Sequence, residues 1–135
     1  MIEHKGIAII DGAVKGNPGK AGIGVVLKNS NGEKVLSLGK FIGKATNNEA
    51  EWLAFIEALR LAKKKFQKLE VITDSQLLVR QWNGLYKIRA QNLLKLQKKA
   101  KKLAEELKEL RVKQGTRSET REAHDLANKA IKDDE

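Results

Sequence analysis

Hydrophobic and polar positions along the first 45 residues follow the pattern of short strands. Residues 6–11 form an apolar run that ends in a carboxylate, which predicts a buried strand. Gly, Asn and Pro punctuate residues 12–22 and predict a loop. Residues 23–28 and 33–42 are again strand-like, and the Asn31–Gly32 pair between them is typical of a tight hairpin. The pattern therefore predicts three strands, of which the last two form a hairpin.

Helical and strand-like spacing alternate in the rest of the chain. Thr46 is a candidate N-cap for a helix in which apolar residues recur at helical spacing as far as residue 62. Ser118 is a candidate N-cap for a second helix over 118–132. The other expected elements are strands over 69–73 and 110–112 and helices over 75–82 and 91–110. The order βββ-α-β-α-α-β-α predicts an α/β fold with one mixed sheet and helices on both of its faces. We expect one domain over 1–132 and a short acidic tail over 133–135.

The composition narrows the classes of function. The chain has 135 residues, no cysteine and a formal charge of +10, so disulfide scaffolds, thiol nucleophiles and cysteine-type zinc sites are excluded. No apolar run is long enough to cross a bilayer, and the N-terminus has no signal-peptide pattern, which predicts a cytoplasmic location without membrane association. A chain this basic usually binds a polyanion, nucleic acid before an anionic membrane surface. The alternative is that the lysines only solvate the surface.

Three acidic residues are candidates for a metal site. Asp11 and Asp74 each end an apolar strand, and Glu51 lies in the first turn of a helix. If the two strands are neighbours, the carboxylates repel each other unless a cation holds them. Oxygen ligands without cysteine or a histidine pair favour Mg²⁺ or Mn²⁺. The alternative is three unrelated surface acids.

Four motifs, in order along nearly the whole chain, resemble type 1 ribonuclease H. They are Asp-Gly-Ala…Gly-Asn-Pro-Gly…Gly-Ile-Gly over 11–24, Thr-Asn-Asn-Glu-Ala-Glu over 46–51, Thr-Asp-Ser-Gln over 73–76 and Ala-His-Asp-Leu-Ala-Asn-Lys-Ala over 123–130. The resemblance implies a ribonuclease H-like fold, whose five-stranded mixed sheet has three antiparallel strands followed by parallel ones.

The resemblance also implies an activity, namely endonucleolytic hydrolysis of the RNA strand of RNA–DNA hybrids. Asp11, Glu51 and Asp74 match three of the family's four metal-binding carboxylates, and Glu49 is not the matching acid. The implied mechanism uses two ions about 3.5–4 Å apart, one activating a water and the other stabilising the leaving 3′ oxygen. Asp11 would bridge both ions, and the products would carry 5′-phosphate and 3′-hydroxyl ends.

The last motif departs from the family pattern, because His124 stands where the fourth acid is expected. A neutral imidazole can ligate a divalent ion and would favour Mn²⁺ over Mg²⁺. Asp125 is turned by about 100° on the helix and cannot take its place without a rotation of the helix. Either His124 is a catalytic metal ligand, or it ligates nothing and three acids carry the site. The alternative function is a ribonuclease H-like binding module with weak or lost catalysis.

Several polar loop residues match positions that contact the hybrid in the family. Small polar side chains and glycine amides can approach 2′-hydroxyls and phosphates closely. A basic segment over 87–113, with ten basic and three acidic residues, resembles the family's DNA-gripping handle, although a charge run is also typical of a solvated face. We expect a monomer whose substrate-binding residues are Gly12, Asn17, Thr46, Asn47, Asn48, Gln76, Trp82, Lys95, Lys98, Lys99 and Lys102.

Overall fold

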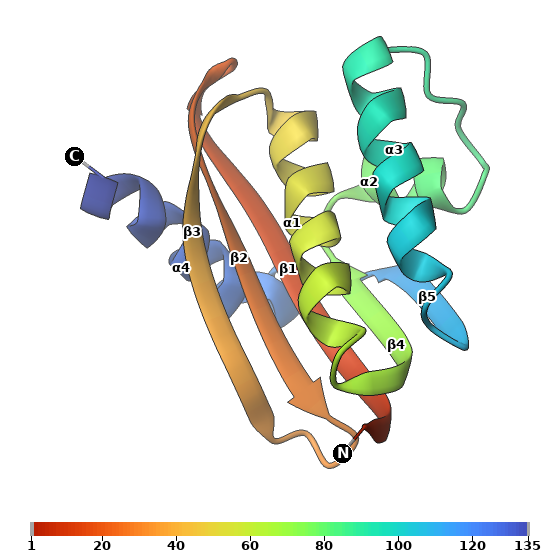
Figure 1. Cartoon of the computed structure of the whole chain (residues 1–135). Helices are drawn as coiled ribbons and strands as arrows, with labels where there is room; N and C mark the ends of the chain where they lie inside the picture. Colours follow the sequence, from red (N-terminus) through yellow and green to blue (C-terminus); the bar gives the residue numbers. More distant parts are fainter. Residues whose placement is uncertain (1, 135) are drawn as a thin grey trace.

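A five-stranded mixed sheet forms the centre of the molecule (Figure 1). The computed structural model describes residues 2–134, and the strand order across the sheet is β3-β2-β1-β4-β5. The β1–β2 and β2–β3 pairs are antiparallel, and the β1–β4 and β4–β5 pairs are parallel. The strands are β1 (Glu3–Gly16), β2 (Gly19–Asn29), β3 (Lys34–Ala45), β4 (Phe66–Thr73) and β5 (Glu109–Gln114). This architecture confirms the predicted fold class.

The segment expected to be a loop over 12–22 is instead a long β-hairpin. Its pairing runs without interruption from Gly6 opposite Asn29 to Gly16 opposite Gly19, so only residues 17 and 18 form the turn. The loop prediction was wrong because glycine is a breaker in local sequence rules, whereas here several glycines lie inside paired strands. As a result Asp11 lies within β1 and not at its end.

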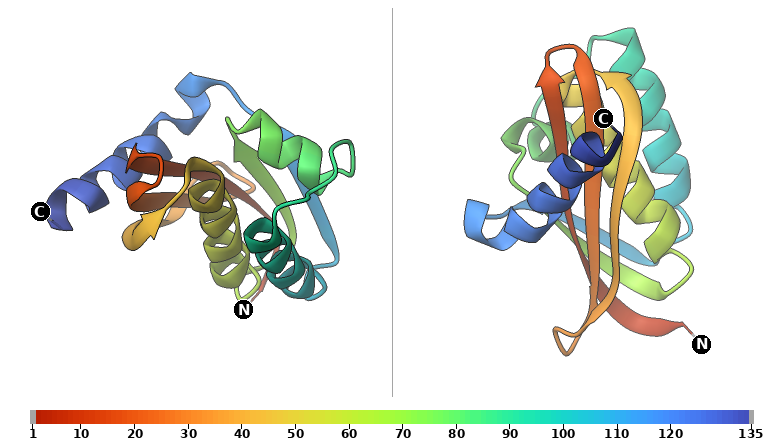
Figure 2. Two further views of the ribbon diagram at one scale, coloured as in Figure 1. Left: turned by 90° about the horizontal axis from the view of Figure 1, so that it is seen from above. Right: turned by 90° about the vertical axis from the view of Figure 1, so that its left-hand side faces the viewer.

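Helices cover both faces of the sheet, as the pattern predicts (Figure 2). Helix α1 packs against β1 and β2 on one face, with α3 against α1, while α4 lies across β1, β2 and β3 on the opposite face. The helices are α1 (Asn47–Ala62), α2 (Gln76–Trp82), α3 (Gln91–Ala104) and α4 (Arg117–Asp134). Trp52, Phe55 and Trp82 pack edge to face in the larger core between the sheet and α1, where α2 also joins. The smaller core lies under α4.

Two helices begin with a reciprocal capping box. The Thr46 hydroxyl accepts from the Glu49 amide while the Glu49 carboxylate accepts from the Thr46 amide, so Glu49 caps α1. The Thr116 and Glu119 groups make the same exchange at the start of α4. The predicted cap at Ser118 was therefore wrong by two residues.

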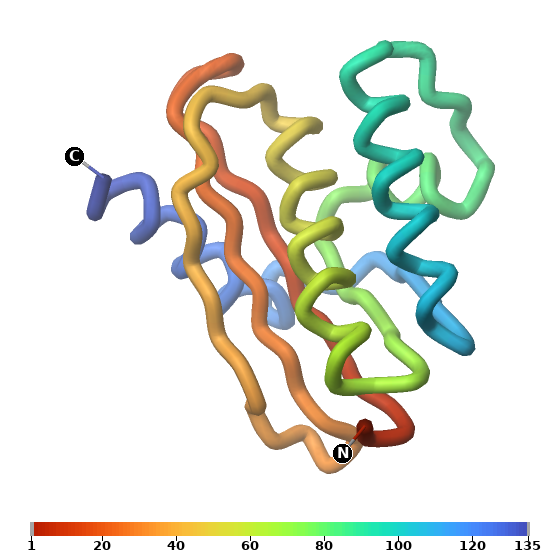
Figure 3. Tube along the Cα trace, viewed as in Figure 1, coloured from red at the N-terminus to blue at the C-terminus, as the bar shows by residue number. Residues whose placement is uncertain are grey.

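The remaining differences concern element ends. Helix α3 ends at Ala104 and not at residue 110, as the apolar period predicts. The last two leucines of that period lie outside the helix, Leu107 in the following turn and Leu110 in β5. Asp133 and Asp134, expected in an acidic tail, continue α4, and Glu135 lies outside the described residues. Figure 3 follows the connection from α2 to α3, the only long one without regular structure among residues 2–134. No helix in the described part of the chain has the length and apolarity needed to span a membrane.

Candidate active site

Three carboxylates converge at the sheet edge where β4 ends. Asp11, Glu51 and Asp74 each offer an oxygen, and these three oxygens lie within 4.8 Å of one another. No other group of three histidine, aspartate or glutamate side chains within residues 2–134 is as close. The structure thus brings together the three acids predicted as a cluster.

The parallel pairing of β1 and β4 explains how Asp11 and Asp74 meet. The ladder between these strands ends with Ile9 opposite Ile72, so each aspartate lies two residues beyond a paired position. Side chains two residues apart share a face of a strand, which directs Asp11 to the face covered by α4. Because β4 ends at Thr73, Asp74 follows directly at the open end of the ladder.

Glu51 reaches the same place from α1 on the other face of the sheet. Its Oε1 accepts a hydrogen bond of 2.6 Å from the Gly12 amide of β1. A side-chain carbon at Gly12 would lie 2.6 Å from the Ala50 carbonyl carbon, so glycine is needed for β1 to approach α1 this closely. The hydrogen bond and the close packing hold Glu51 beside Asp11.

The electrostatics show that the cluster is unfavourable without a cation. Burial raises the pKa of Asp11 to about 6, the His124 hydrogen bond opposes this rise, and the nearby Asp74 charge adds to it. The pKa of Glu51 is raised well above its usual range by burial and then by the charges of Asp11 and Asp74. A divalent cation would relieve this repulsion, and oxygen donors suit Mg²⁺ or Mn²⁺. The residues present therefore fit a divalent metal site.

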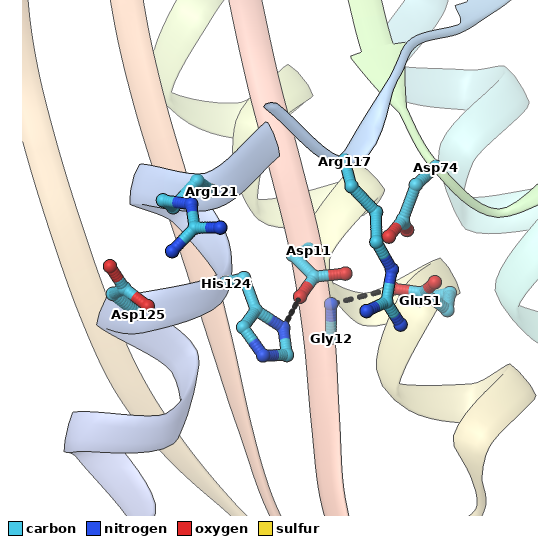
Figure 4. A pocket seen from close by; sticks show the side chains of 8 residues that line it. All are labelled: Asp11, Gly12, Glu51, Asp74, Arg117, Arg121, His124 and Asp125. Atoms are coloured by element: carbon cyan, nitrogen blue, oxygen red, sulfur yellow. Dashed lines mark hydrogen bonds and ion pairs between the residues drawn. The ribbon is translucent and has the colours of Figure 1, made fainter. Parts of the chain in front are cut away.

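The cluster lines a pocket of about 530 Å³ to which α4 contributes a second wall (Figure 4). Arg117 and Arg121 extend into this pocket from α4, and sequence reasoning missed both. Arg117, Arg121 and His124 are spaced by four and three residues and therefore share one face of the helix. This spacing is the sequence signal from which the two arginines could have been predicted. Two guanidinium groups beside three carboxylates make a site suited to a phosphate held against the acids.

His124 contacts the acid cluster through Asp11 alone. Its Nδ1 lies 2.7 Å from Asp11 Oδ2, and its Nε2 lies 3.0 Å from the Asn128 side-chain amide. Asp125 also lines the pocket but lies farther along its wall, away from the three acids (Figure 4). This is the orientation expected from the 100° step between neighbouring helical residues.

Four of the predicted substrate contacts gather in a second, polar pocket of about 430 Å³. The Asn47 amide donates to Asn17 Oδ1 at 3.0 Å, which ties the start of α1 to the β1–β2 turn. Asn92 of α3, which was not predicted from the sequence, also lines this pocket, together with Ala90 and Leu93. The predicted residues in this pocket are Asn17, Thr46, Asn47 and Asn48. Thr46 is the N-cap of α1, as predicted, and its contact with a substrate stays a prediction.

The other predicted contacts lie at four places. Gly12 belongs to the acidic pocket, and Gln76 is exposed at the start of α2. Trp82 packs edge to face on Phe55 in the larger core, which favours a packing role for most of its ring. Lys95, Lys98, Lys99 and Lys102 are exposed on α3, and no ion pair engages them within residues 2–134.

Comparison with known proteins agrees with the sequence motifs. The model of the family described as reverse transcriptase-like matches residues 9–130. Ribonuclease HI of Halobacterium salinarum is 36% identical over 127 residues, which cover 93% of this chain and 64% of that protein. A bifunctional protein of Mycobacterium tuberculosis is 37% identical over 123 residues, which cover 90% of this chain and 34% of that protein. This chain therefore spans less than two thirds of the length of these relatives.

Solved structures match over nearly the whole chain. The crystal structure of RNase H1 from Halobacterium salinarum superposes with a TM-score of 0.93 at 35% identity, covering 96% of this chain and 98% of that one. LC11-RNase H1, solved in complex with an RNA/DNA hybrid, superposes with a TM-score of 0.89 at 34% identity and the same coverage. Both likenesses include the strands and helices that carry the acid cluster.

Proposed function

The chain belongs to the type 1 ribonuclease H family, and we propose that it is a ribonuclease H, a metal-dependent endonuclease that hydrolyses the RNA strand of RNA–DNA hybrids. The observation that carries the proposal is the convergence of Asp11, Glu51 and Asp74 within 4.8 Å in an open pocket. The hybrid bound to LC11-RNase H1 supports the choice of substrate.

Asp11, Glu51 and Asp74 would hold the divalent ion or ions. Bound divalent cations supply positive charge that lowers the pKa of an attacking water and stabilises the leaving 3′ oxygen, giving 5′-phosphate and 3′-hydroxyl products. The use of two ions and the choice between Mg²⁺ and Mn²⁺ are part of the proposal. Burial and neighbouring charges raise the pKa values of Asp11 and Glu51, so a bound cation would favour the ionised forms of these two acids.

The chain's own groups would bind and orient the substrate. Arg117 and Arg121 are placed to hold phosphate oxygens beside the acids. The polar pocket around Asn17, Asn47 and Asn48 offers hydrogen-bonding groups to sugars and phosphates, and the exposed Gln76 at the start of α2 offers another. Contacts of this kind distinguish backbone shape and 2′-hydroxyls, so we expect little dependence on base sequence.

A second function deserves a test because His124 stands in the position of the family's fourth acid. A chain that retains the fold and the polar pocket but lacks an efficient metal site would bind hybrids with weak or lost cleavage. The cytoplasmic location and monomeric state expected from the sequence stay predictions.

A cleavage assay on matched duplexes separates the two functions. An RNA–DNA hybrid labelled on its RNA strand should be cut internally in Mg²⁺ or Mn²⁺, whereas DNA duplex of the same sequence should stay intact. Double-stranded RNA serves as the third substrate, because the sequence does not decide whether it is cut. Tight binding of the hybrid without cleavage in either metal would favour the binding module.

The lysines of α3 should control affinity and not turnover. Changing Lys95, Lys98, Lys99 and Lys102 together to Gln should raise the KM for hybrid and leave kcat nearly unchanged, because such contacts bind ground state and transition state alike. If each lysine contacts one phosphate, the slope of log KM against log salt concentration should fall by roughly 3. Steady-state kinetics at several salt concentrations measure both effects.

A charge-matched variant controls for the loss of four positive charges. Lys5, Lys34, Lys64 and Lys132 are exposed and lie outside the basic segment over 87–113, so their change to Gln should alter the salt slope much less. Equal slopes for the two quadruple variants would assign the α3 lysines to a solvated face.

A further inference from the structure

The side chain of Asn128 makes two hydrogen bonds to the same residue, one turn earlier on α4. Its Nδ2 lies 3.0 Å from His124 Nε2 and 3.0 Å from the His124 backbone carbonyl oxygen. A carbonyl oxygen can only accept, so the Asn128 atom facing it must be the NH₂ group and not the amide oxygen. The backbone contact therefore fixes which way the Asn128 amide is turned.

This orientation also fixes the role of each ring nitrogen of His124. The second Asn128 N–H points to Nε2, which must accept and therefore carries no proton. A neutral imidazole then has its proton on Nδ1, where it lies 2.7 Å from Asp11 Oδ2. The chain of donors thus runs from Asn128 to His124 and from His124 to Asp11.

We propose that His124 is a positioning residue for Asp11, to which it donates its Nδ1 proton, and that Asn128 holds it in this tautomer. The inference rests on the proposed function, in which Asp11 holds the divalent ion. His124 would then replace the fourth carboxylate of the family with a hydrogen-bond donor to the first one. Metal binding would rest on the three acids.

The geometry leaves His124 without a lone pair for a metal. Nδ1 carries the proton given to Asp11, and the lone pair of Nε2 accepts from Asn128. Ligation would require His124 to change tautomer or to break one of these two contacts. A donor on Oδ2 also fixes the rotation of the Asp11 carboxylate, whose other oxygen lies on the side of Glu51 and Asp74 (Figure 4). Groups that hold metal ligands in this way commonly affect metal affinity 10–100-fold.

The contact also favours the ionised form of Asp11. Burial and the Asp74 charge both raise the pKa of Asp11, and the His124 hydrogen bond acts against them.

Nuclear magnetic resonance of the metal-free protein tests the tautomer directly. Long-range proton–nitrogen correlations at pH 8.5 should show His124 with a protonated Nδ1 and a bare Nε2, and saturating Mg²⁺ should leave that pattern unchanged. In Asn128→Asp the carboxylate can only accept, so Nε2 should gain a proton. Lys129→Gln changes the net charge equally on the same exposed stretch of α4 and should keep the wild-type pattern. A protonated Nε2 in the wild type, or a proton lost from Nδ1 on adding Mg²⁺, would overturn the proposal.

Two substitutions of His124 separate donation from ligation. In His124→Asn the side-chain NH₂ can occupy the place of Nδ1 and donate to Asp11, whereas His124→Leu removes the donor at similar size. Calorimetry with Mg²⁺ and Mn²⁺ should show affinity within about threefold of wild type for His124→Asn and 10–100-fold weaker binding for His124→Leu. Equal losses in both variants would make His124 a ligand and contradict the proposal.

The metal and tautomer measurements are independent of the substrate. If the wild type shows the expected tautomer and binds metal but cuts no hybrid, the proposed function fails and the positioning role stands. If it cuts hybrid but His124 has the other tautomer, only the positioning role fails.

Discussion

Asp11→Asn and Asp74→Asn should each lower the rate of RNA-strand cleavage at least about 1,000-fold, because each removes a ligand charge worth several kcal/mol in the transition state. The same substitutions should leave the metal-free protein as stable as the wild type or more so. Each removes one charge from three carboxylates that lie within 4.8 Å of one another. Activity assays and thermal melts in EDTA measure the two effects.

The stability gain for Asp11→Asn should depend on pH in a defined direction. Because the pKa of Asp11 is raised from 3.8 to about 6, the folded protein binds this proton more tightly than the unfolded chain. The ionised group therefore costs stability in full above pH 6, and the cost disappears as pH falls toward 4. Asp11→Asn should gain up to about 3 kcal/mol at pH 7–8 and almost nothing at pH 4.

Two comparisons make this result specific to the cluster. Saturating Mg²⁺ should stabilise the wild type and stabilise Asp11→Asn much less, since only the former retains all three ligands. Asp125→Asn alters an acid on the wall of the same pocket and should change cleavage and stability little. Robust cleavage by Asp11→Asn would exclude the metal-site assignment, and a large loss in Asp125→Asn would show that Asp125 substitutes for the fourth acid.

The three acids could be found from the sequence because each is tied to a local signal. Asp11 and Asp74 follow apolar runs that pair as neighbouring parallel strands, and Glu51 follows the capping segment of α1. Asp11 and Asp74 meet because β1 and β4 are neighbours, and Glu51 joins them because α1 packs closely on β1. The resemblance to a known family supplied this arrangement.

Residues on α4 were harder to predict, because their roles depend on how the helix lies across the sheet. Arg117 and Arg121 had no motif of their own, and their pocket is formed only when α4 crosses β1. Asn128 was part of a motif, but its contact with His124 Nε2 depends on the rotamers of both side chains. A sequence pattern gives the helical face and not these contacts.

Three glycines of β2 and β3 also depend on how α4 lies across the sheet. A side-chain carbon at Gly24 would lie 1.9 Å from the Ala123 carbonyl oxygen of α4, and the corresponding distances to α4 carbonyls are 2.3 Å at Gly22 and 2.7 Å at Gly39. Local rules treat glycine as a breaker, which placed Gly22 in a predicted loop, whereas all three glycines are needed because of a helix about 100 residues later in the chain. Small residues at these positions let the α4 backbone lie directly on β2 and β3.

Gly24→Ala should therefore have the largest effect on stability of any single methyl addition considered for this sheet. The new methyl group would meet backbone of α4, which cannot move aside like a flexible side chain. We expect a loss of at least about 3 kcal/mol in the free energy of unfolding, measured by urea or thermal denaturation. A shift of α4 of about 1 Å would also move His124 and Arg117, so residual cleavage should fall about 100-fold.

Gly32→Ala separates this packing effect from the conformational cost of replacing glycine. Gly32 lies in the β2–β3 turn with φ of 82°, and a side-chain carbon there would have nothing within 4 Å. Its replacement should cost about 1–2 kcal/mol through backbone strain and leave cleavage unchanged, because no residue of this turn lines the pocket. If Gly24→Ala lost no more stability and activity than Gly32→Ala, α4 would have to move away from the new methyl group at little cost in free energy. The placement of His124 against Asp11 would then not depend on close packing of α4 against β2.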